Sequence, residues 1–282
     1  MLGVFLIWYS YNKFTPEQLL EIKGHFAKAN YWYLVLSLVF GFLSHASRAF
    51  RWNYLLQPMG HKTRFPNAIM AIFIAYLMNL AIPRSGEVSR ALVASKYDGV
   101  PFDKAFGTIV AERVADLVIL IALIFTAFTL QFDELQGFLA AKVPLYNLMV
   151  FGIVLMVVGL ASLWFVYKTN NAISIKIRNF TAGLKEGVLS IVTMKKKWWF
   201  ILHTLFIWAM YVLMFYIAIF ALKETSQITF GVAITAFVVG SFTIAFTNGG
   251  FGSYPFFIAE ILLLFGIMET VGTAFGWIVW IS

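Results

Sequence analysis

The chain has 282 residues, of which 61% are hydrophobic, 18% aromatic and only 12% charged, with a mean hydropathy of +0.83. A soluble globular protein carries about 25% charged residues, so this chain has too little polar surface to cover itself in water. The composition therefore predicts an integral membrane protein. The absence of cysteine excludes a disulfide framework, thiolate metal sites and a cysteine nucleophile.

The formal net charge of +8 is interpreted as a sign of orientation. In membrane proteins Lys and Arg mark the cytoplasmic loops and the anionic leaflet. Basic residues gather in segments 48–64, 84–104 and 168–197, which we expect on the cytoplasmic side. The charge therefore predicts no nucleic-acid partner.

Apolar runs define the expected fold, because a helix needs about 20 apolar residues to cross the hydrocarbon core. The first run, Met1 to about Tyr11, lacks the features of a signal peptide, and we interpret it as part of a transmembrane helix. We expect an all-α integral membrane protein with about six to eight hydrophobic segments in one polytopic domain, residues 1–282. The runs begin near Leu2, Tyr31, Phe65, Phe102, Leu145, Trp198, Ile228 and Glu269.

Two further helices are expected outside the spans. Thr15 and Pro16 form a cap and first-turn pair for a short helix that ends near Asn30. In segment 170–196, apolar residues recur at helical spacing opposite Lys176, Arg178 and Lys185. This pattern predicts an amphipathic helix on the cytoplasmic membrane surface.

Two apolar segments are broken by Pro or Gly: "NLAIPRSGEVSR" (Asn79 to Arg90) and "TNGGFGSYP" (Thr247 to Pro255). Irregular backbone survives in a membrane only where protein or a water-filled cavity satisfies its polar groups. We therefore predict two re-entrant hairpins, within repeat halves 31–130 and 198–282 that are inverted by the single span between them. Their tips would meet near the midplane, as in transporter sites. The distribution of basic residues leaves ordinary spans open as an alternative.

Glu112, Arg113 and Asp116 lie inside the apolar run 105–130. Charges at this depth need partners. Arg113 can pair with Asp116 three residues on, and the other carboxylate then needs a cation from elsewhere. The candidates for that cation are Arg48, Arg51, Arg84 and Arg90. A structural ion-pair clasp and a role in transport both remain open.

The first break is a candidate anion site, because a new helix can begin at about Gly86 and helix starts favour phosphate or carboxylate. Arg84 and Arg90 would strengthen it, and Ser85, Gly86 and Glu87 are the other candidate substrate-binding residues at this break. Alternatively, Glu87 pairs with Arg90 and the arginines extend to the interface. At the second break, residues Asn248, Gly249, Gly250 and Gly252 either line a substrate path or form a kink for close packing.

Three segments carry a resemblance: "SRAFRWNYLL" (Ser47 to Leu56), "NLAIPRSGEVSRALVASKYDGVPFDKAFGTIVAERVADL" (Asn79 to Leu117) and "GGFGSYP" (Gly249 to Pro255). Together they resemble the flippase-like membrane domain of lysylphosphatidylglycerol synthases. In the multiple peptide resistance factor, this domain moves an aminoacylated phospholipid across the cytoplasmic membrane. Other members look like transporters of lipid-linked or polyprenyl-linked substrates.

The resemblance implies a multi-pass protein of a bacterial or archaeal cytoplasmic membrane. Asn248 and Pro255 depart from the family pattern, which often has Pro and an acidic residue there. The 282 residues do not include the family's aminoacyl-transferase domain, so no lipid synthesis is implied. The matching positions are Pro83, Arg84, Gly86, Glu87, Arg90, Glu112, Arg113, Asp116, Gly249, Gly250 and Gly252.

We therefore expect a translocase of a phospholipid or polyprenyl-linked anionic lipid that is not an enzyme and uses no cofactor. Membrane lipids are the expected partners, and homo-oligomer formation is left open. The alternative is a proton- or ion-coupled transporter of a small solute, with Asp116 as the titrating group. An intramembrane hydrolase has less support, because Ser253 and His203 follow no catalytic spacing.

Overall fold

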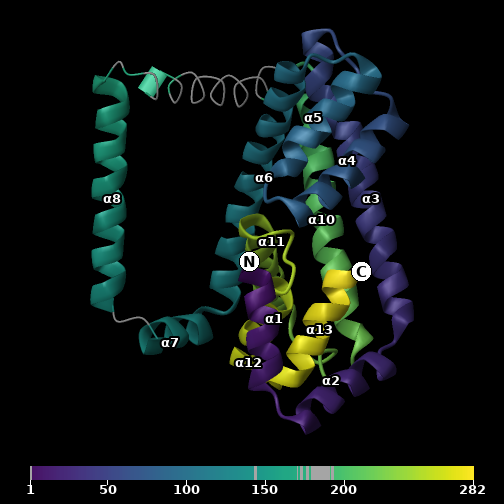
Figure 1. Cartoon of the computed structure of the whole chain (residues 1–282), viewed down its shortest axis with the longest axis vertical. Helices are drawn as coiled ribbons and strands as arrows, with labels where there is room; N and C mark the ends of the chain where they lie inside the picture. The colour runs from purple at the N-terminus through teal and green to yellow at the C-terminus, as the bar shows by residue number, and fades with distance from the viewer. Residues whose placement is uncertain are drawn as a thin grey trace.

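The computed structural model describes residues 2–142, 145–169 and 194–282, together with residues 171, 174, 175, 178 and 191. Throughout this described part the regular structure is helical, with no strand. The expected all-α class is confirmed. Figure 1 shows a long helical bundle, with α8 standing apart on one side of it.

The helices follow the predicted apolar runs. The N-terminal part consists of α1 (Leu2–Lys13), α2 (Pro16–Lys28), α3 (Tyr31–Leu56), α4 (Phe65–Ala81), α5 (Ser85–Asp98) and α6 (Phe102–Leu130). The remainder consists of α7 (Phe132–Lys142), α8 (Leu145–Lys168), α10 (Lys197–Ala218), α11 (Phe230–Phe246), α12 (Ser253–Leu264) and α13 (Glu269–Ile281). Short 3-10 turns, Gln57–Met59 and Ile219–Ala221, follow α3 and α10.

Among the described residues, three helices are long and apolar enough to cross a membrane: α3 with its following turn, α6, and α10 with its following turn. Helices α3 and α10 pack closely against each other. They run in opposite directions, because the Asn30 amide at the start of α3 donates to the Ala221 carbonyl just beyond α10 (2.7 Å). In Figure 1, α3 runs along the side of the bundle that faces away from α8, and α10 lies nearer the middle.

The two broken segments form helical hairpins. Helices α4 and α5 pack together, as do α11 and α12. At 1.5 Å per residue, the 17 residues of α4 and the 17 of α11 span about 25 Å, less than a full crossing of about 30 Å. Since α3 and α10 are antiparallel and each leads into one hairpin, the hairpins approach from opposite ends of the bundle (Figure 1).

The hairpin tips meet, as the sequence predicts. Arg84 at the first tip donates through Nη2 to the Ala245 carbonyl of the second (3.0 Å). In return, Asn248 donates through Nδ2 to the Ala81 carbonyl (3.4 Å). Arg84 has a φ of 62°, in the left-handed region where a non-glycine residue is strained. This pair of hydrogen bonds links the two halves of the chain at their breaks.

The short helix expected after Thr15 is confirmed as α2, which begins with a capping box between Thr15 and Gln18. The amphipathic helix expected over 170–196 falls mostly outside the described residues. That part of the topology therefore remains a prediction.

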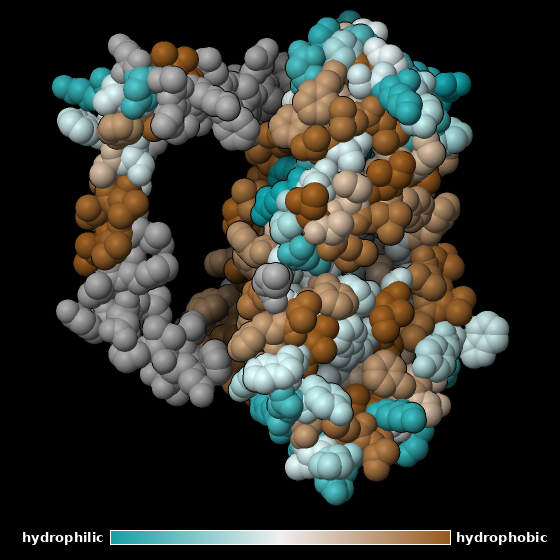
Figure 2. Space-filling model, viewed as in Figure 1, coloured by the Kyte–Doolittle hydropathy of each residue, from teal (hydrophilic) through white to brown (hydrophobic). Residues whose placement is uncertain are grey.

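Apolar side chains pack differently in the two halves. The second half contains the larger core, in which Phe215, Ile258 and Phe275 are buried among α10 to α13. A second core surrounds Trp52 and Ile109 between α3 and α6. Figure 2 shows brown, apolar side chains around the bundle, hydrophilic ones at its ends, and further hydrophilic ones at half height on the side facing α8.

Candidate functional site

Charged side chains from three helices converge inside the first half of the bundle. At 1.5 Å per residue, Arg48 and Arg51 lie roughly 12 Å and 8 Å before the end of α3. Asp116 occupies the midpoint of α6. The cluster comprises Arg48 and Arg51 from α3, Glu87 and Arg90 from α5, and Glu112, Arg113 and Asp116 from α6. We call these seven residues the charge cluster.

Asp116 is held mainly by Arg51. Arg51 donates through Nη1 to Oδ1 (2.8 Å) and through Nη2 to Oδ2 (3.3 Å), which is a bidentate pair. The Trp208 indole also donates to Oδ1 (3.3 Å), and Arg48 Nη2 reaches Oδ2 at 3.5 Å. The expected pairing of Arg113 with Asp116 exists only at the limit of contact, 4.0 Å. Arg51, one of the cations proposed to complete the site, is therefore the main partner.

Glu112 pairs with Arg90. Arg90 Nη1 donates to Glu112 Oε2 at 2.6 Å, and both side chains are buried. The Arg90 guanidinium lies 4.0 Å from the centre of the Trp52 ring. Arg51 Nε lies 3.7 Å from the other Glu112 oxygen. Arg90 is thus fixed on three sides: by its helix, by an aromatic ring and by a carboxylate.

Two sequence-based interpretations of Arg90 are wrong. It does not extend to the membrane surface, and it does not pair with Glu87. Glu87 instead pairs with Arg113, with Oε1 3.1 Å from Nη2. The physical reason is depth: a guanidinium buried in apolar surroundings needs a carboxylate that is also desolvated, and Glu112 supplies it.

The start of α5 does not present free N–H groups in the way expected of an anion site. The Ser85 amide donates to the Ile82 carbonyl (3.2 Å), and the Gly86 amide donates to Asn79 Oδ1 (2.8 Å). Ser85 Oγ also donates within the hairpin, to the carbonyls of Met78 and Ile82. These donors close the turn. The exposed Arg84 remains accessible at this tip.

Glycines at the second break permit close packing. Gly249, Gly250 and Gly252 all have positive φ values, which glycine adopts without strain. A Cβ on Gly252 would lie 2.3 Å from the Gly3 carbonyl oxygen of α1. The Trp280 indole donates to the Gly249 carbonyl (2.8 Å), which satisfies part of the irregular backbone. These contacts support the interpretation of the second break as a kink for close packing. A role of these glycines in lining a substrate path remains a proposal.

Sequence reasoning missed three aromatic residues around the charge cluster. Trp208 donates to Asp116, and the hydroxyls of Tyr76 and Tyr211 lie 3.2 Å apart, which joins α4 to α10. The Tyr211 ring lies 5.7 Å from the Arg48 guanidinium carbon. In a chain that is 18% aromatic, the sequence offers no signal that separates these residues from lipid-facing ones.

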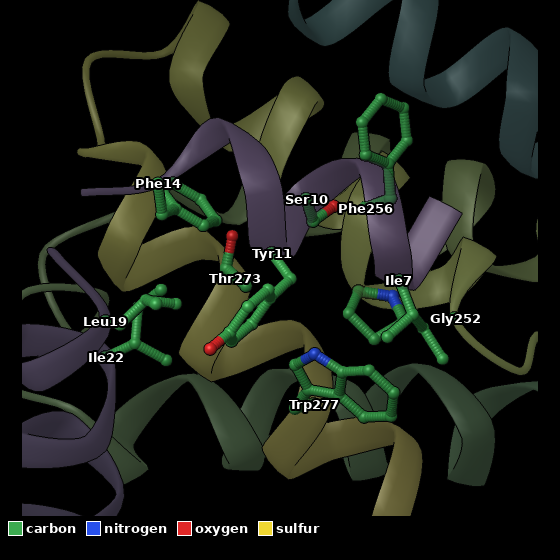
Figure 3. A pocket seen from close by; sticks show the side chains of 11 residues that line it. Ile7, Ser10, Tyr11, Phe14, Leu19, Ile22, Gly252, Phe256, Thr273 and Trp277 are labelled. Atoms are coloured by element: carbon green, nitrogen blue, oxygen red, sulfur yellow. The ribbon is translucent and has the colours of Figure 1, made fainter. Parts of the chain in front are cut away.

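A separate cavity of about 140 Å³ lies among α1, α2, α12 and α13. Figure 3 shows Tyr11, Thr273 and Trp277 around it, with Phe14, Leu19 and Ile22 on one side. Its lining is mostly apolar and includes no member of the charge cluster. The cavity therefore lies apart from the candidate site.

Comparisons with known proteins place the sequence in a membrane-protein family. The family described as Lysylphosphatidylglycerol synthase TM region matches residues 1–280. A UPF0104 membrane protein from Methanocaldococcus jannaschii is 29% identical over 109 residues, which cover 38% of this chain and 32% of that protein. The matched segment thus spans about a third of the relative. No solved structure matches the chain.

Proposed function

This chain belongs to the Lysylphosphatidylglycerol synthase TM region family, and from that premise we propose that it is a translocase that moves an anionic lipid across its membrane. The lipid is a phospholipid or a polyprenyl-linked phosphate. The protein supplies a path through the bilayer and performs no covalent chemistry. A bacterial or archaeal cytoplasmic membrane is the setting that we propose for it.

One observation carries the proposal: four arginines meet three carboxylates between α3, α5 and α6, and the cluster therefore has a formal surplus of one positive charge. Burying charges in a membrane is costly, and such residues usually mark a substrate or ion pathway. A surplus of guanidinium groups favours an anion, because their planar forks bind phosphate at two points. The hairpin tips add broken backbone, with Arg84 at the first tip only six residues before Arg90, and broken helices of this kind occur at transporter sites.

The alternative, proton-coupled transport through Asp116, has less support. A coupling carboxylate must exchange its proton with water. Both oxygens of Asp116 are already occupied, by Arg51 and Trp208 on one side and by Arg51 and Arg48 on the other. Asp116 therefore holds the arginines in place. We propose that the anion that moves through the site is the substrate itself.

A reconstitution experiment tests the proposal. The purified protein is placed in liposomes with a fluorescent phosphatidylglycerol, and a membrane-impermeant reductant then bleaches the outer leaflet. We expect bleaching beyond the outer-leaflet fraction, because translocation delivers inner lipid to the reductant. The same liposomes without protein, and with an unrelated helical membrane protein, are the controls. A bleached fraction equal to that of empty liposomes, repeated with a polyprenyl phosphate probe, would contradict lipid translocation.

A further inference from the structure

One arginine of the charge cluster has no carboxylate of its own. Asp116 forms its bidentate pair with Arg51, and Glu112 forms the 2.6 Å pair with Arg90. Glu87 pairs with Arg113 at 3.1 Å. After these three pairings, Arg48 is the cation left over.

Arg48 is buried, with only 5% of its surface exposed. Its Nη2 lies 3.5 Å from Asp116 Oδ2, the oxygen that already accepts from Arg51. Its Nε is buried without a hydrogen-bond partner among the described residues. A desolvated guanidinium without a full counter-charge destabilises a fold unless another group, such as a bound anion, neutralises it. The geometry at Arg48 therefore favours the binding of an additional anion.

The surroundings of Arg48 suit a phosphate. The hydroxyls of Tyr76 and Tyr211 lie 3.2 Å apart, and the Tyr211 ring faces the guanidinium. His45 Nδ1 is another buried polar atom without a partner in the described structure, and its ring lies 4.9 Å from that of Tyr76. Hydroxyl and imidazole N–H groups can both donate to phosphate oxygens.

Two side chains of the site and its surroundings are exposed at the surface of the bundle. Tyr76 is 41% exposed, and the Arg113 side chain is 48% exposed. Helices α4 and α10 are joined here by the two tyrosine hydroxyls. We expect a head group to reach the buried Arg48 past these exposed side chains. The hydrophilic patch at half height in Figure 2 lies on the side facing α8.

We propose that Arg48 receives the head group of the transported lipid, and that this head group is a phosphodiester with a single negative charge. The assignment rests on the proposed function. One negative charge neutralises the surplus of the cluster, whereas a diphosphate would leave a net negative charge in a desolvated site. The site therefore selects phosphodiester lipids over polyprenyl diphosphates.

Binding and stability are measured on the same variants in maltoside detergent. Native mass spectrometry gives the affinity for phosphatidylglycerol, for a polyprenyl diphosphate and for uncharged diacylglycerol. Arg48→Gln should weaken phosphatidylglycerol binding at least about tenfold, as expected for the loss of a charged hydrogen-bonding group. Without lipid, its thermal unfolding midpoint should equal or exceed that of the parent, because Arg48 has only a 3.5 Å contact with a carboxylate that Arg51 already holds.

Two arginines serve as comparisons. Arg51→Gln should lower the lipid-free unfolding midpoint, since it leaves Asp116 buried without its bidentate partner. Arg64 lies outside the cluster, with a side chain that is 76% exposed and paired with Asp98. Arg64→Gln should leave lipid affinity unchanged and so report any general effect of losing a positive charge.

Each remaining outcome overturns a defined part of the proposal. If Arg48→Gln binds phosphatidylglycerol like the parent, or destabilises the lipid-free protein as strongly as Arg51→Gln, then Arg48 is a structural residue and the assignment is wrong. If the parent binds the diphosphate more tightly than phosphatidylglycerol, the single-charge assignment is wrong while lipid translocation stands. If the parent binds neither anionic lipid better than diacylglycerol, the proposed function fails as well.

Discussion

Arg90 and Glu112 connect α5 to α6 through a 2.6 Å ion pair from which water is excluded. The pair is further enclosed by Trp52, whose ring lies against the Arg90 guanidinium and whose indole donates to Thr108. Charges in such surroundings stabilise a fold only in combination, because each alone has lost its hydration. The two residues must therefore be analysed together.

A double-mutant cycle measures this dependence. Arg90→Met and Glu112→Leu, made singly, should each lower the free energy of unfolding by about 3 to 5 kcal/mol, because each leaves a buried charge uncompensated. The double variant should lose much less than the sum, with a coupling of the sign expected for interacting neighbours. Unfolding in mixed detergent micelles gives the three values. Additive losses would show that the two charges are stabilised independently.

Glycine positions offer a second test at this scale. A Cβ on Gly86 would lie 2.4 Å from the Ala75 carbonyl oxygen, whereas a Cβ on Gly107 would meet nothing within 4 Å. Gly86→Ala should therefore push α5 away from α4 and cost about 1 to 3 kcal/mol. Gly107→Ala, the matched control in α6, should be neutral or stabilise the helix by up to about 1 kcal/mol. Equal unfolding midpoints for the two variants would contradict the close packing of the first hairpin.

At the scale of elements, the two hairpin tips form one contact unit. The hydrogen bond from Arg84 to Ala245 and the one from Asn248 to Ala81 run in opposite directions between the same two turns. Neither break could be moved far without disturbing the other. A conformational change that opens a path between the halves must break both.

Cysteines at Ala81 and Asn248 test this arrangement in a chain that has none of its own. A short bifunctional maleimide should link them, since the Asn248 amide nitrogen lies 3.4 Å from the Ala81 carbonyl oxygen. The control pair keeps the cysteine at Ala81 and has its second cysteine at Lys223, which follows α10 and its 3-10 turn. This pair should stay unlinked. Mass spectrometry of proteolytic fragments identifies the link. Equal yields from both pairs would mean that the tips do not meet.

The sequence predicted the elements better than their contacts. Each apolar run became a helix, and the breaks at Pro83 and Gly249 became hairpin turns, because run length and helix-breaking residues are local properties. Which arginine meets which carboxylate is a property of packing. Arg51 and Arg90 were among four candidates, and only the approach of α3 and α5 to α6 selects them. Tyr76 and Tyr211 gave no signal, because tyrosine in an apolar run is typical of any membrane helix.

At the scale of the whole molecule, the two halves share an order of elements but differ in chemistry. Long helix, broken hairpin and further helix occur in both, as α3 to α6 and as α10 to α13. The first half encloses the charge cluster, while the second packs the larger apolar core. If the proposed function is right, we expect the second half to be the rigid frame and the charged half to be the part that binds the lipid.

Orientation is a prediction for the whole chain, drawn from its basic segments. A cysteine in place of Lys62, beyond the end of α3, should be shielded from an impermeant maleimide in intact cells and labelled after lysis. A cysteine in place of Lys23, exposed on α2 before α3 begins, should be labelled in intact cells. Both positions are exposed, so differences in labelling report the side of the membrane. The reverse pattern would invert the topology.

The charges at the centre of the bundle also constrain how the protein is made. Helix α3 enters the insertion machinery with two arginines that end up buried, and α6 follows with three ionisable residues around its midpoint. Each central charge costs on the order of 2.5 to 3.5 kcal/mol to place in lipid alone. The partners that offset this cost lie on the other helix, so α3 gains its neutralising carboxylates only once α6 has been synthesised. We therefore expect α3 to remain beside the translocon until some 70 further residues have been translated, and we expect a nascent chain that stops before α6 to be recognised as unfinished by quality-control proteases.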